Sequence, residues 1–357
     1  MKVNGKNYTA VWMEKGVVCM IDQRVLPHSF KILRLPSSED TAEAIRNMTT
    51  RGAGSIGAAA GFGAAQAAAE AAKGKSFRSI FSKKMAVLRK TRPTAQDLFH
   101  ALDRIADVVT PLSDRPEIAV NMARAAAEAL SNEYVENGRK ISEYGEKLIP
   151  KNGVILTHCN AGWLGLQDWG SALAPIYAAH RAGKKIKVLV DETRPRLQGM
   201  KLTAWELKQE GVPFEIIPDN AAGHYLKAGD IDLVITGADR IAINGDAANK
   251  IGTYEKAACA KLAGVPFYIA APVTTFDPAC KSGKDIPIEE RDHDEVLWIS
   301  GRDRKGKITE ITPAPLGVTA KNPAFDVTPA SFITSFITNK GVIKPAKIAQ
   351  FCKKLGN

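Results

Sequence analysis

The sequence is poor in the residues that build disulfide frameworks and membrane segments. Its 357 residues include five cysteines, an odd number, with no Cys-x-x-Cys pair and no cysteine–histidine cluster. This pattern argues against a disulfide framework or a structural zinc site and favours a reducing compartment. No run of about 18 apolar residues is present, so we expect no membrane partner. The first residues lack the apolar core of a secretory signal, which predicts a cytoplasmic protein.

The chain also lacks a concentrated nucleic-acid-binding pattern, although it is basic. Its formal net charge is +11, and a basic surface can bind nucleic acid. However, the charges are spread along the chain, and the two densest groups, at 77–90 and 302–307, are short. We therefore expect a solvated basic surface that favours anionic substrates, and no nucleic-acid partner.

The first half of the chain carries mainly helical signals. A length of 357 residues predicts about two domains. Two short β-rich stretches, at 8–12 and 16–21, come first and are separated by a turn. Helical signals then follow at 42–48, 58–72, 94–109 and 117–130, and the first of these has a helix start at Ser37–Asp40. We predict a mainly helical N-terminal domain, preceded by short strands, over residues 1–149.

From residue 150 onward, short apolar runs alternate with helical stretches. The expected strands are 154–157, 186–190, 214–217, 233–236 and 267–270, and the expected helices are 171–182, 203–210 and 254–263. Strands separated by helices imply βαβ units. The sequence therefore predicts a Rossmann-like α/β domain with a parallel sheet over residues 150–357. Such sheets bind ligands beyond the C-terminal ends of their strands.

Cofactor and metal signatures are missing from these strand ends. No Gly-x-Gly-x-x-Gly string follows a predicted strand, and the nearest string, Asn160–Gly165, is a weak match. This argues against a nucleotide-dependent oxidoreductase. His158, Cys159 and Asp191 do not have the spacing of a metal-ligand set. We therefore expect neither cofactor nor metal.

Polar strings do follow three of the predicted strands, at 157–162, 191–199 and 237–252. A fourth string, Arg51–Gly57, opens the alanine-rich helix. Glycines at a helix N-terminus let backbone N–H groups approach an anion, and a neighbouring arginine adds charge-assisted hydrogen bonds. This string therefore predicts phosphate binding; the alternative is a glycine-rich surface for helix packing.

These four strings closely resemble those of the 5-methylthioribose-1-phosphate isomerases of methionine salvage. Further strings that resemble the family are Ile21–Pro27, Arg92-Pro-Thr, Ile286–Arg291 and Asn322–Pro329, so the resemblance runs almost end to end. It implies an aldose–ketose isomerase that converts 5-methylthioribose 1-phosphate into 5-methylthioribulose 1-phosphate. It also implies a homodimer. The same superfamily holds ribose-1,5-bisphosphate isomerases and the regulatory subunits of a translation-initiation exchange factor.

The resemblance assigns roles to individual residues. The family's catalytic cysteine and aspartate correspond to Cys159, in Thr-His-Cys-Asn, and Asp239, in Gly-Ala-Asp-Arg. Its substrate contacts correspond to Arg51, Gly52, Ala53, Arg92, Gln198, Asn249 and Lys250. Regulatory subunits generally lack the full catalytic set, so the presence of both catalytic residues argues against a non-catalytic sensor.

The chemistry of a sugar 1-phosphate sets demands on the catalytic pair. The furanose ring must open, which requires a general acid, and Asp239 can serve only where burial raises its pKa. Cys159 acts as a base only as a thiolate, which requires a lowered pKa. A helix N-terminus at 160–162 and a nearby cation are the expected sources. His158 is not expected to partner Cys159, because adjacent residues of an extended segment point to opposite faces.

Two strings depart from the family pattern. Gly54 and Ser55 replace the usual Pro-Ala, and the bulky string 163–169 follows Asn-Ala-Gly. Trp163 and Trp169 either belong to the core or form a wall for the C5 substituent of the sugar. In the second case, sugars that are apolar at C5 are favoured. Alternative substrates are 5-deoxyribose 1-phosphate and ribose 1,5-bisphosphate.

Overall fold

The structure is a computed structural model that describes residues 1–92 and 95–355. Pro93 and Thr94, from the Arg-Pro-Thr string and the start of one predicted helix, lie outside the described residues. The chain divides into two compact units. The first unit holds residues 1–146, 161–178 and 272–275, and the second unit holds 147–160, 179–271 and the chain from 276 onward. The chain thus returns to the first unit twice, which the single predicted boundary between residues 149 and 150 does not anticipate.

The first unit begins with small antiparallel sheets. Strands β1 (Lys2–Val3) and β2 (Lys6–Asn7) form a short hairpin. Strands β3 (Val11–Glu14), β4 (Val17–Ile21) and β5 (Ile32–Leu35) form a three-stranded sheet in that order. Lys15 and Gly16 connect β3 to β4 with φ angles of 50° and 84°. A two-residue loop with positive φ at both positions matches the twist of a hairpin, so the predicted pair of strands is confirmed.

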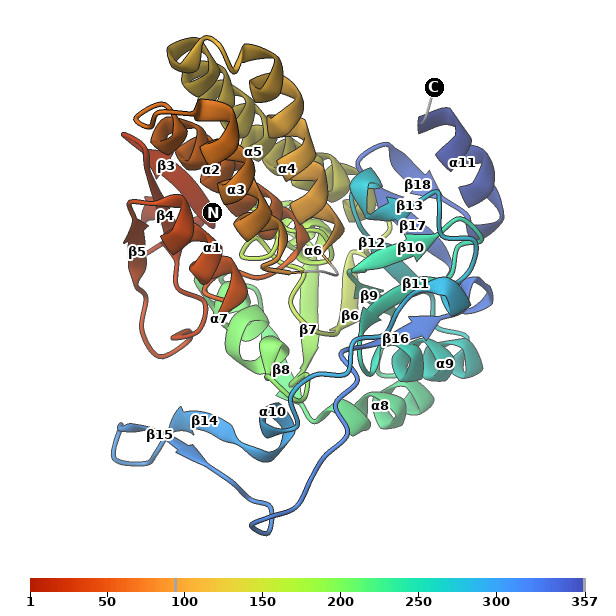
Figure 1. Ribbon diagram of the computed structural model, residues 1–357. Helices are drawn as coiled ribbons and strands as arrows, with labels where there is room; N and C mark the ends of the chain where they lie inside the picture. The colour runs from red at the N-terminus through yellow and green to blue at the C-terminus, as the bar shows by residue number, and fades with distance from the viewer. Residues whose placement is uncertain (93–94, 356–357) are drawn as a thin grey trace. The chain divides into compact units, whose positions relative to one another are not determined.

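Helices make up most of the first unit, as predicted (Figure 1). They are α1 (Ser38–Arg46), α2 (Ala53–Ala71), α3 (Phe77–Arg89), α4 (Gln96–Val109) and α5 (Pro116–Glu146). A capping box between Ser37 and Asp40 starts α1. Helix α2 is buried along nearly its whole length and packs against α3, α4 and α5. Its alanines and glycines allow this close approach, since they add almost no side-chain bulk.

The second unit is built on a seven-stranded sheet with the order β18-β17-β12-β9-β6-β7-β8. The strands are β6 (Asn152–Thr157), β7 (Lys185–Asp191), β8 (Phe214–Ile217), β9 (Leu233–Thr236), β12 (Phe267–Ala270), β17 (Ser335–Thr338) and β18 (Gly341–Ile343). All are parallel except β18. The five strands predicted from apolar runs are confirmed, and β17 and β18 were not predicted. The strand order reverses between β6 and β9, which is where such sheets bind ligands.

Helices lie between the strands of this sheet along the chain. They are α6 (Leu173–Arg181), whose first residues belong to the first unit, α7 (Ala204–Glu210), α8 (Ala222–Ala228), α9 (Thr253–Ala263) and α10 (Asp294–Leu297). Helix α11 (Ile348–Leu355) follows β18. A π-helical turn, Gly199–Thr203, leads into α7. Short 3-10 turns in the two units span Thr110–Leu112, Asp219–Ala221, Val273–Thr275, Gly283–Asp285, Ala330–Phe332 and Pro345–Lys347. The three predicted crossover helices are confirmed, with small shifts at their ends.

A second, four-stranded sheet lies in the same unit, with the order β13-β10-β11-β16. Its strands are β10 (Arg240–Ala242), β11 (Ala247–Lys250), β13 (Phe276–Asp277) and β16 (Phe325–Thr328). In this sheet Asn249 pairs with Asp326, and Lys250 pairs with Phe325. The sheet thus joins two strings that are far apart in the sequence, 237–252 and 322–329.

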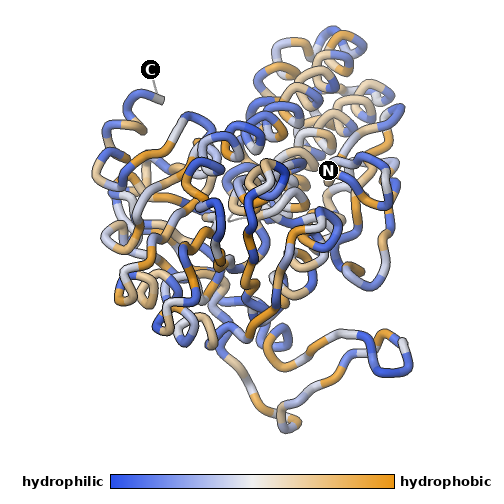
Figure 2. The backbone as a smooth tube through the Cα atoms, turned by 180° about the vertical axis from the view of Figure 1, so that it is seen from behind, coloured by the Kyte–Doolittle hydropathy of each residue, from blue (hydrophilic) through white to orange (hydrophobic). Residues whose placement is uncertain are grey.

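A separate hairpin, β14 (Ile299–Arg302) and β15 (Ile308–Ile311), extends away from the sheets of the second unit (Figure 1). Hydrophilic and hydrophobic residues are mixed along it (Figure 2). Ile308 is half exposed, and Ile311 is more than half exposed. None of the helices in the described residues is long and apolar enough to cross a membrane.

Candidate active site

The two predicted catalytic residues leave neighbouring strands of the second unit. Cys159 follows β6 and Asp239 follows β9, and these strands pair directly through Ile155 with Leu233 and Leu156 with Val234. Parallel strands present their C-terminal ends at one edge of a sheet. Both residues therefore follow the strand ends at the reversal of strand order, the position expected for a ligand site. Asp239 is exposed, so the burial expected of its carboxyl is not found.

Cys159 occupies a tight, strained turn. Its φ of 64° is left-handed, a conformation that costs a non-glycine residue about 1–3 kcal/mol. Its amide donates a hydrogen bond to Thr193 Oγ1 at 2.9 Å, and its carbonyl accepts one from Thr203 Oγ1 at 2.7 Å. The extended conformation assumed for this segment is therefore wrong, and so is the predicted helix start at 160–162, since the next helix begins only at Leu173. The turn is held by Thr193, which follows β7, and by Thr203, at the end of the π-helical turn that leads into α7.

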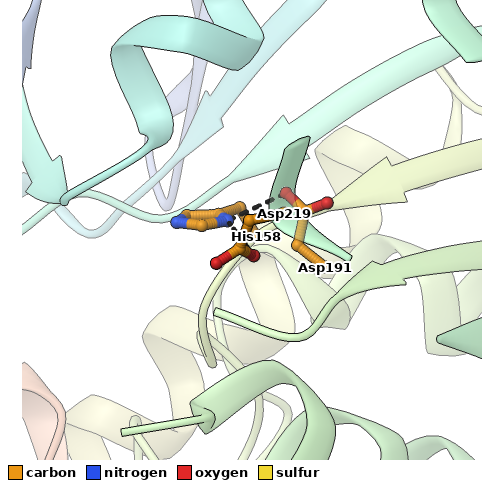
Figure 3. Close-up of side chains that lie close together, drawn as sticks. All are labelled: His158, Asp191 and Asp219. Carbon is orange, nitrogen blue, oxygen red and sulfur yellow. Dashed lines mark hydrogen bonds and ion pairs between the residues drawn. The ribbon is translucent and has the colours of Figure 1, made fainter. Parts of the chain in front are cut away.

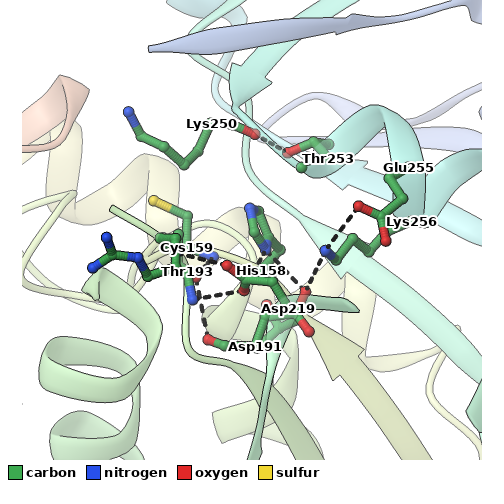
Figure 4. Close-up of polar contacts among 12 residues, drawn as sticks. His158, Cys159, Asp191, Thr193, Asp219, Lys250, Thr253, Glu255 and Lys256 are labelled. Carbon is green, nitrogen blue, oxygen red and sulfur yellow. Dashed lines mark hydrogen bonds and ion pairs between the residues drawn. The ribbon is translucent and has the colours of Figure 1, made fainter. Parts of the chain in front are cut away.

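Lys250 supplies the cation expected near Cys159. Burial lowers the pKa of Lys250, whereas the charges of Cys159 and Asp239 raise it, so the three side chains share one electrostatic environment. Lys250 Nζ donates a hydrogen bond to the carbonyl of Ala324 at 2.9 Å and lies 4.8 Å from the centroid of the Phe325 ring. Figure 4 shows the sulfur of Cys159 directed to the side on which Lys250 lies. The structure thus brings together three of the predicted site residues.

Two more predicted contacts lie on neighbouring segments of the second unit. Asn249 is buried beside Lys250 on β11, and its side-chain amide donates to Thr253 Oγ1 at 2.9 Å. Gln198 is also buried, and its Oε1 has no hydrogen-bond partner among the described residues. Gly199 follows Gln198, where a Cβ would lie 1.7 Å from the carbonyl oxygen of Asp191. Only glycine fits there, which fixes the path of the chain at Gln198.

The remaining predicted contacts belong to the first unit. Arg51, Gly52 and Ala53 form the N-terminal start of α2, and Arg92 follows α3. Gly52 is the N-cap residue with a φ of 90°, and a Cβ there would lie 2.3 Å from Gly165 Cα. The glycine is therefore needed for close packing against Gly165, independently of any anion that the helix start binds.

The two departures from the family pattern contact each other. A Cβ on Gly54 would lie 2.3 Å from Leu166 Cδ1. Ser55 Oγ donates to the carbonyl of Leu164 at 2.8 Å and accepts from the Gln167 amide at 3.1 Å. Small residues at the start of α2 thus leave room for the bulky string at 163–169, so the two departures are a matched pair.

Trp163 is completely buried in the first unit, at 0% exposure. The loop that carries it is anchored by Gln167, whose side chain exchanges two hydrogen bonds of 2.8 Å with the backbone of Val11 and donates a third to Ser131 Oγ at 2.7 Å. Of the two roles left open for Trp163, this burial favours the core role. Trp169 is partly buried and has a left-handed φ of 64°.

A cluster that sequence spacing did not predict lies beside Cys159. His158, Asp191 and Asp219 bring one ring nitrogen and two carboxylate oxygens within 4.8 Å of one another (Figure 3). His158 Nδ1 lies 2.9 Å from Asp191 Oδ2, and Asp219 accepts hydrogen bonds from the amides of Thr193 and Arg194 at 2.7 and 2.6 Å. Protein groups thus already contact these potential ligand atoms. The position of Asp191 at the end of β7 was the signal that could have revealed the cluster.

Residues 49–345 match the model of the initiation factor 2 subunit family. The chain belongs to this family. A curated relative from Acetivibrio thermocellus, named methylthioribose-1-phosphate isomerase, is 46% identical over 333 residues, which cover 92% of this chain and 95% of the relative.

Solved structures of relatives have the same fold as this initiation factor 2 subunit family member. The 5-methylthioribose 1-phosphate isomerase from Pyrococcus horikoshii OT3 superposes with a TM-score of 0.87 at 43% identity, covering 98% of this chain and 96% of the other. A translation initiation factor eIF-2B delta subunit from A. fulgidus superposes with a TM-score of 0.84 at 37% identity, covering 98% and 100%. The expected α/β fold, with a helical N-terminal region and a mostly parallel sheet, is confirmed.

Proposed function

We propose that this protein is an aldose–ketose isomerase that converts 5-methylthioribose 1-phosphate into 5-methylthioribulose 1-phosphate in methionine salvage. The names of its relatives support this activity. The observation that carries the proposal is that Cys159 and Asp239 follow adjacent strands, with the half-buried Lys250 near enough to interact electrostatically with both. Partial burial of an ammonium is costly, so such a lysine beside an acid and a thiol indicates a functional site. We further propose that the protein is a cytoplasmic homodimer.

The proposed reaction uses Cys159 and Asp239 as a proton-transfer pair. Asp239 donates its proton to the ring oxygen as the bond from that oxygen to C1 breaks. The Cys159 thiolate then takes the proton from C2, which leaves an enol phosphate. The same proton returns from the thiol to C1, while the C2 hydroxyl gives its proton to the Asp239 carboxylate and becomes the ketone. Both groups end in their starting states. In the alternative route, a hydride moves directly from C2 to C1, and Cys159 keeps no proton.

Lys250 has two roles in this proposal. Its ammonium stabilises the thiolate form of Cys159, because an opposite charge favours the ionised form. It also binds the anionic phosphate that the substrate carries throughout the reaction. A lysine suits both roles, since its compact charge does not require the planar geometry of an arginine.

We propose that the other predicted residues bind substrate. Arg51, Gly52 and Ala53 offer a guanidinium and the N-terminal amides of α2, a helix of 19 residues, and this combination favours phosphate. Arg92 adds a second guanidinium. The unpartnered Oε1 of Gln198 accepts a hydrogen bond from a sugar hydroxyl, which satisfies the buried oxygen. Asn249 contacts the sugar from β11.

A second candidate function is a non-catalytic regulatory subunit, which the similarity to the A. fulgidus eIF-2B delta structure favours. Such a subunit needs sugar-phosphate or nucleotide binding but no proton transfer. The strained Cys159 turn and the half-buried Lys250 argue for catalysis, since a sensor has no need for either.

The test is turnover of three sugars by the purified protein, with product identification. We expect 5-methylthioribose 1-phosphate to react fastest, followed by 5-deoxyribose 1-phosphate and then ribose 1,5-bisphosphate. A preference for the bisphosphate would keep the isomerase but change its substrate. Binding without turnover of any of the three would favour the regulatory subunit. Light scattering of the same preparation gives the oligomeric state.

A further inference from the structure

His158 lies immediately before Cys159, is 1% exposed, and has both ring nitrogens in hydrogen-bond contact (Figure 4). Nδ1 lies 2.9 Å from Asp191 Oδ2, at the end of β7. Nε2 lies 2.8 Å from the carbonyl oxygen of Ile251, in the turn that follows Lys250. The ring therefore links the ends of three strands. Cys159 follows β6, the turn at Thr193 follows β7, and Lys250 is the last residue of β11.

The partners of the ring determine its protons. A carbonyl oxygen can only accept, so Nε2 must carry a hydrogen. A carboxylate also only accepts, so Nδ1 must carry one as well unless Asp191 is protonated. A neutral imidazole has a single N–H. The His158–Asp191 pair therefore holds one proton more than a neutral ring beside an ionised carboxylate.

Four charged groups lie around the ring and bear on where this proton resides. Asp191, Asp219 and Asp326 supply carboxylates from β7, the 3-10 turn that follows β8, and β16, and Lys256 supplies an ammonium from α9. The ammonium lies 3.6 Å from Asp191 Oδ2 and has no hydrogen bond within the described residues, so its contribution there is its charge.

Two of the neighbouring carboxylates accept hydrogen bonds from backbone amides. Asp326 accepts hydrogen bonds from the amides of Gly252 and Tyr254 at 2.6 and 3.0 Å. Asp219 accepts from two further backbone amides. Burial holds the pKa of Asp191 above its ordinary value, although the hydrogen bond with His158 and the charges of His158 and Lys256 act to lower it. Glu255, the remaining charged group near Lys256, is half exposed and lies 3.8 Å from its Nζ. A second buried cation balances this set better than a neutral ring does.

We infer that His158 is a doubly protonated imidazolium that positions the Cys159 turn against Lys250. It is a positioning residue, because both ring nitrogens are occupied by protein groups and neither is available to the sugar. The inference rests on the proposed function only for its catalytic consequence. Gly252 packs closely against the ring. A Cβ on Gly252 would lie 3.1 Å from His158 Cε1, so a side chain at position 252 would crowd the ring.

The direct test is nitrogen NMR of the intact protein labelled with ¹⁵N-histidine, at pH 7.5. The buried histidine is recognised by ring N–H protons that exchange slowly with water, because it is shielded from solvent. We expect both of its nitrogens to carry a directly bonded proton. A ring with Nε2 protonated and Nδ1 bare would place the proton on Asp191 and overturn the inference. This measurement needs no substrate, so it stands apart from any failure of the proposed function.

The positioning role is tested with His158→Gln, against His100→Gln on the exposed surface of α4 as the matched control. The readouts are kcat, KM and the rate of Cys159 alkylation by iodoacetamide, located by peptide mass spectrometry. We expect His158→Gln to lower kcat and the alkylation rate about 10- to 100-fold, the effect of a misplaced reactive group, with little change in KM. The control should match the wild type.

Unchanged kcat and unchanged alkylation in a folded His158→Gln protein would contradict the positioning role. Should His158→Gln fail to fold, Asp191→Asn provides the second variant. It keeps an acceptor for Nδ1 but removes the charge, so we expect one ring proton to be lost in the NMR measurement. Retention of both protons in Asp191→Asn would show that the carboxylate is not their cause and would overturn the account of the charges.

Discussion

The start of α2 in the first unit and the strand-end turns in the second unit both use tightly packed backbone, but they fill the space differently. Around Gly52 and Gly54, every close neighbour is backbone or an apolar side chain, and Ser55 has its hydrogen bonds satisfied. Around Cys159 and Lys250, the neighbours are threonine hydroxyls and charged groups, of which Lys250 is half-buried and Asp239 is exposed. The first arrangement gains stability from packing, whereas the second gives up stability to hold reactive groups.

The comparison separates two kinds of unusual residue. A glycine whose Cβ would meet backbone marks close packing and does not by itself mark a ligand site. A left-handed cysteine held by hydrogen bonds with distant threonines, beside a half-buried lysine, indicates chemistry. Substitutions in the first group should therefore change melting, and those in the second should change turnover.

Trp163→Ala should have the largest effect on stability. Removal of a completely buried indole costs about 3–5 kcal/mol, so we expect a large fall in melting temperature. Turnover of all three sugars by the protein that remains folded should change equally. The matched control is Trp298→Ala, because Trp298 is 40% exposed. A selective loss of sugars that are apolar at C5 would return Trp163 to the substrate site.

Gly52→Ala should have the next largest effect on stability. The new Cβ would lie 2.3 Å from Gly165 Cα at a φ of 90°, so overpacking and backbone strain together cost about 2–4 kcal/mol. Gly183→Ala is the control, since its φ of 82° is equally strained but its Cβ meets nothing within 4 Å. Urea unfolding of both variants separates the cost of overpacking from the cost of backbone strain. Equal destabilisation would mean that close packing at Gly52 contributes little.

Lys250→Met should lower turnover without lowering stability. We expect kcat/KM to fall about 100-fold, as for the loss of a charged group that stabilises the transition state. The melting temperature should be kept or raised, because a half-buried charge is replaced by an apolar side chain of similar size. A large fall in melting temperature would assign Lys250 a structural role.

The dependence of kcat/KM on pH tests the role of the Lys250 charge further. Burial lowers the pKa of Lys250, so the ammonium is lost at a pH below the ordinary lysine range, and kcat/KM should decline there. Lys250→Arg should move this alkaline decline upward, because a guanidinium stays protonated. An unchanged alkaline limb would show that another group controls it.

Glu295→Gln should have the smallest effect. Arg291 and Arg196 hold the pKa of Glu295 at about 2, below its ordinary value of 4.5. A lowered carboxyl pKa contributes stability that is complete above pH 4.5 and lost as the pH falls through about 2. We expect the variant to lose about 1–2 kcal/mol at pH 7, measured by urea unfolding, and to approach the wild type in acid. Glu289→Gln, at the more exposed partner of Arg291, should change less.

The sequence predicted the elements that follow local rules. Apolar runs located the five main strands, and Ser37 with Asp40 located a helix start. The polar strings at strand ends located Cys159, Asp239 and Lys250. The hairpin at 299–311 was not predicted, because its strands, Ile-Ser-Gly-Arg and Ile-Thr-Glu-Ile, are mainly polar and form no apolar run.

Features that depend on long-range contacts were not predictable. The left-handed turn at Cys159 is set by hydroxyls of Thr193 and Thr203, more than 30 residues away. Lys256 reads as a surface residue of an ordinary helix, yet it is completely buried against a carboxylate from β7. The burial of Trp163 likewise depends on the tertiary fold.

The most direct test of the active-site assignment compares the wild type with Cys159→Ser, using purified protein and 5-methylthioribose 1-phosphate. Serine keeps the size and polarity of cysteine but cannot form an anion near neutral pH. We expect the wild type to release 5-methylthioribulose 1-phosphate and the variant to lose at least about 100-fold in turnover, while calorimetry shows that it still binds the substrate. Near-normal turnover by the serine variant would contradict the role of Cys159 and with it the proposed mechanism.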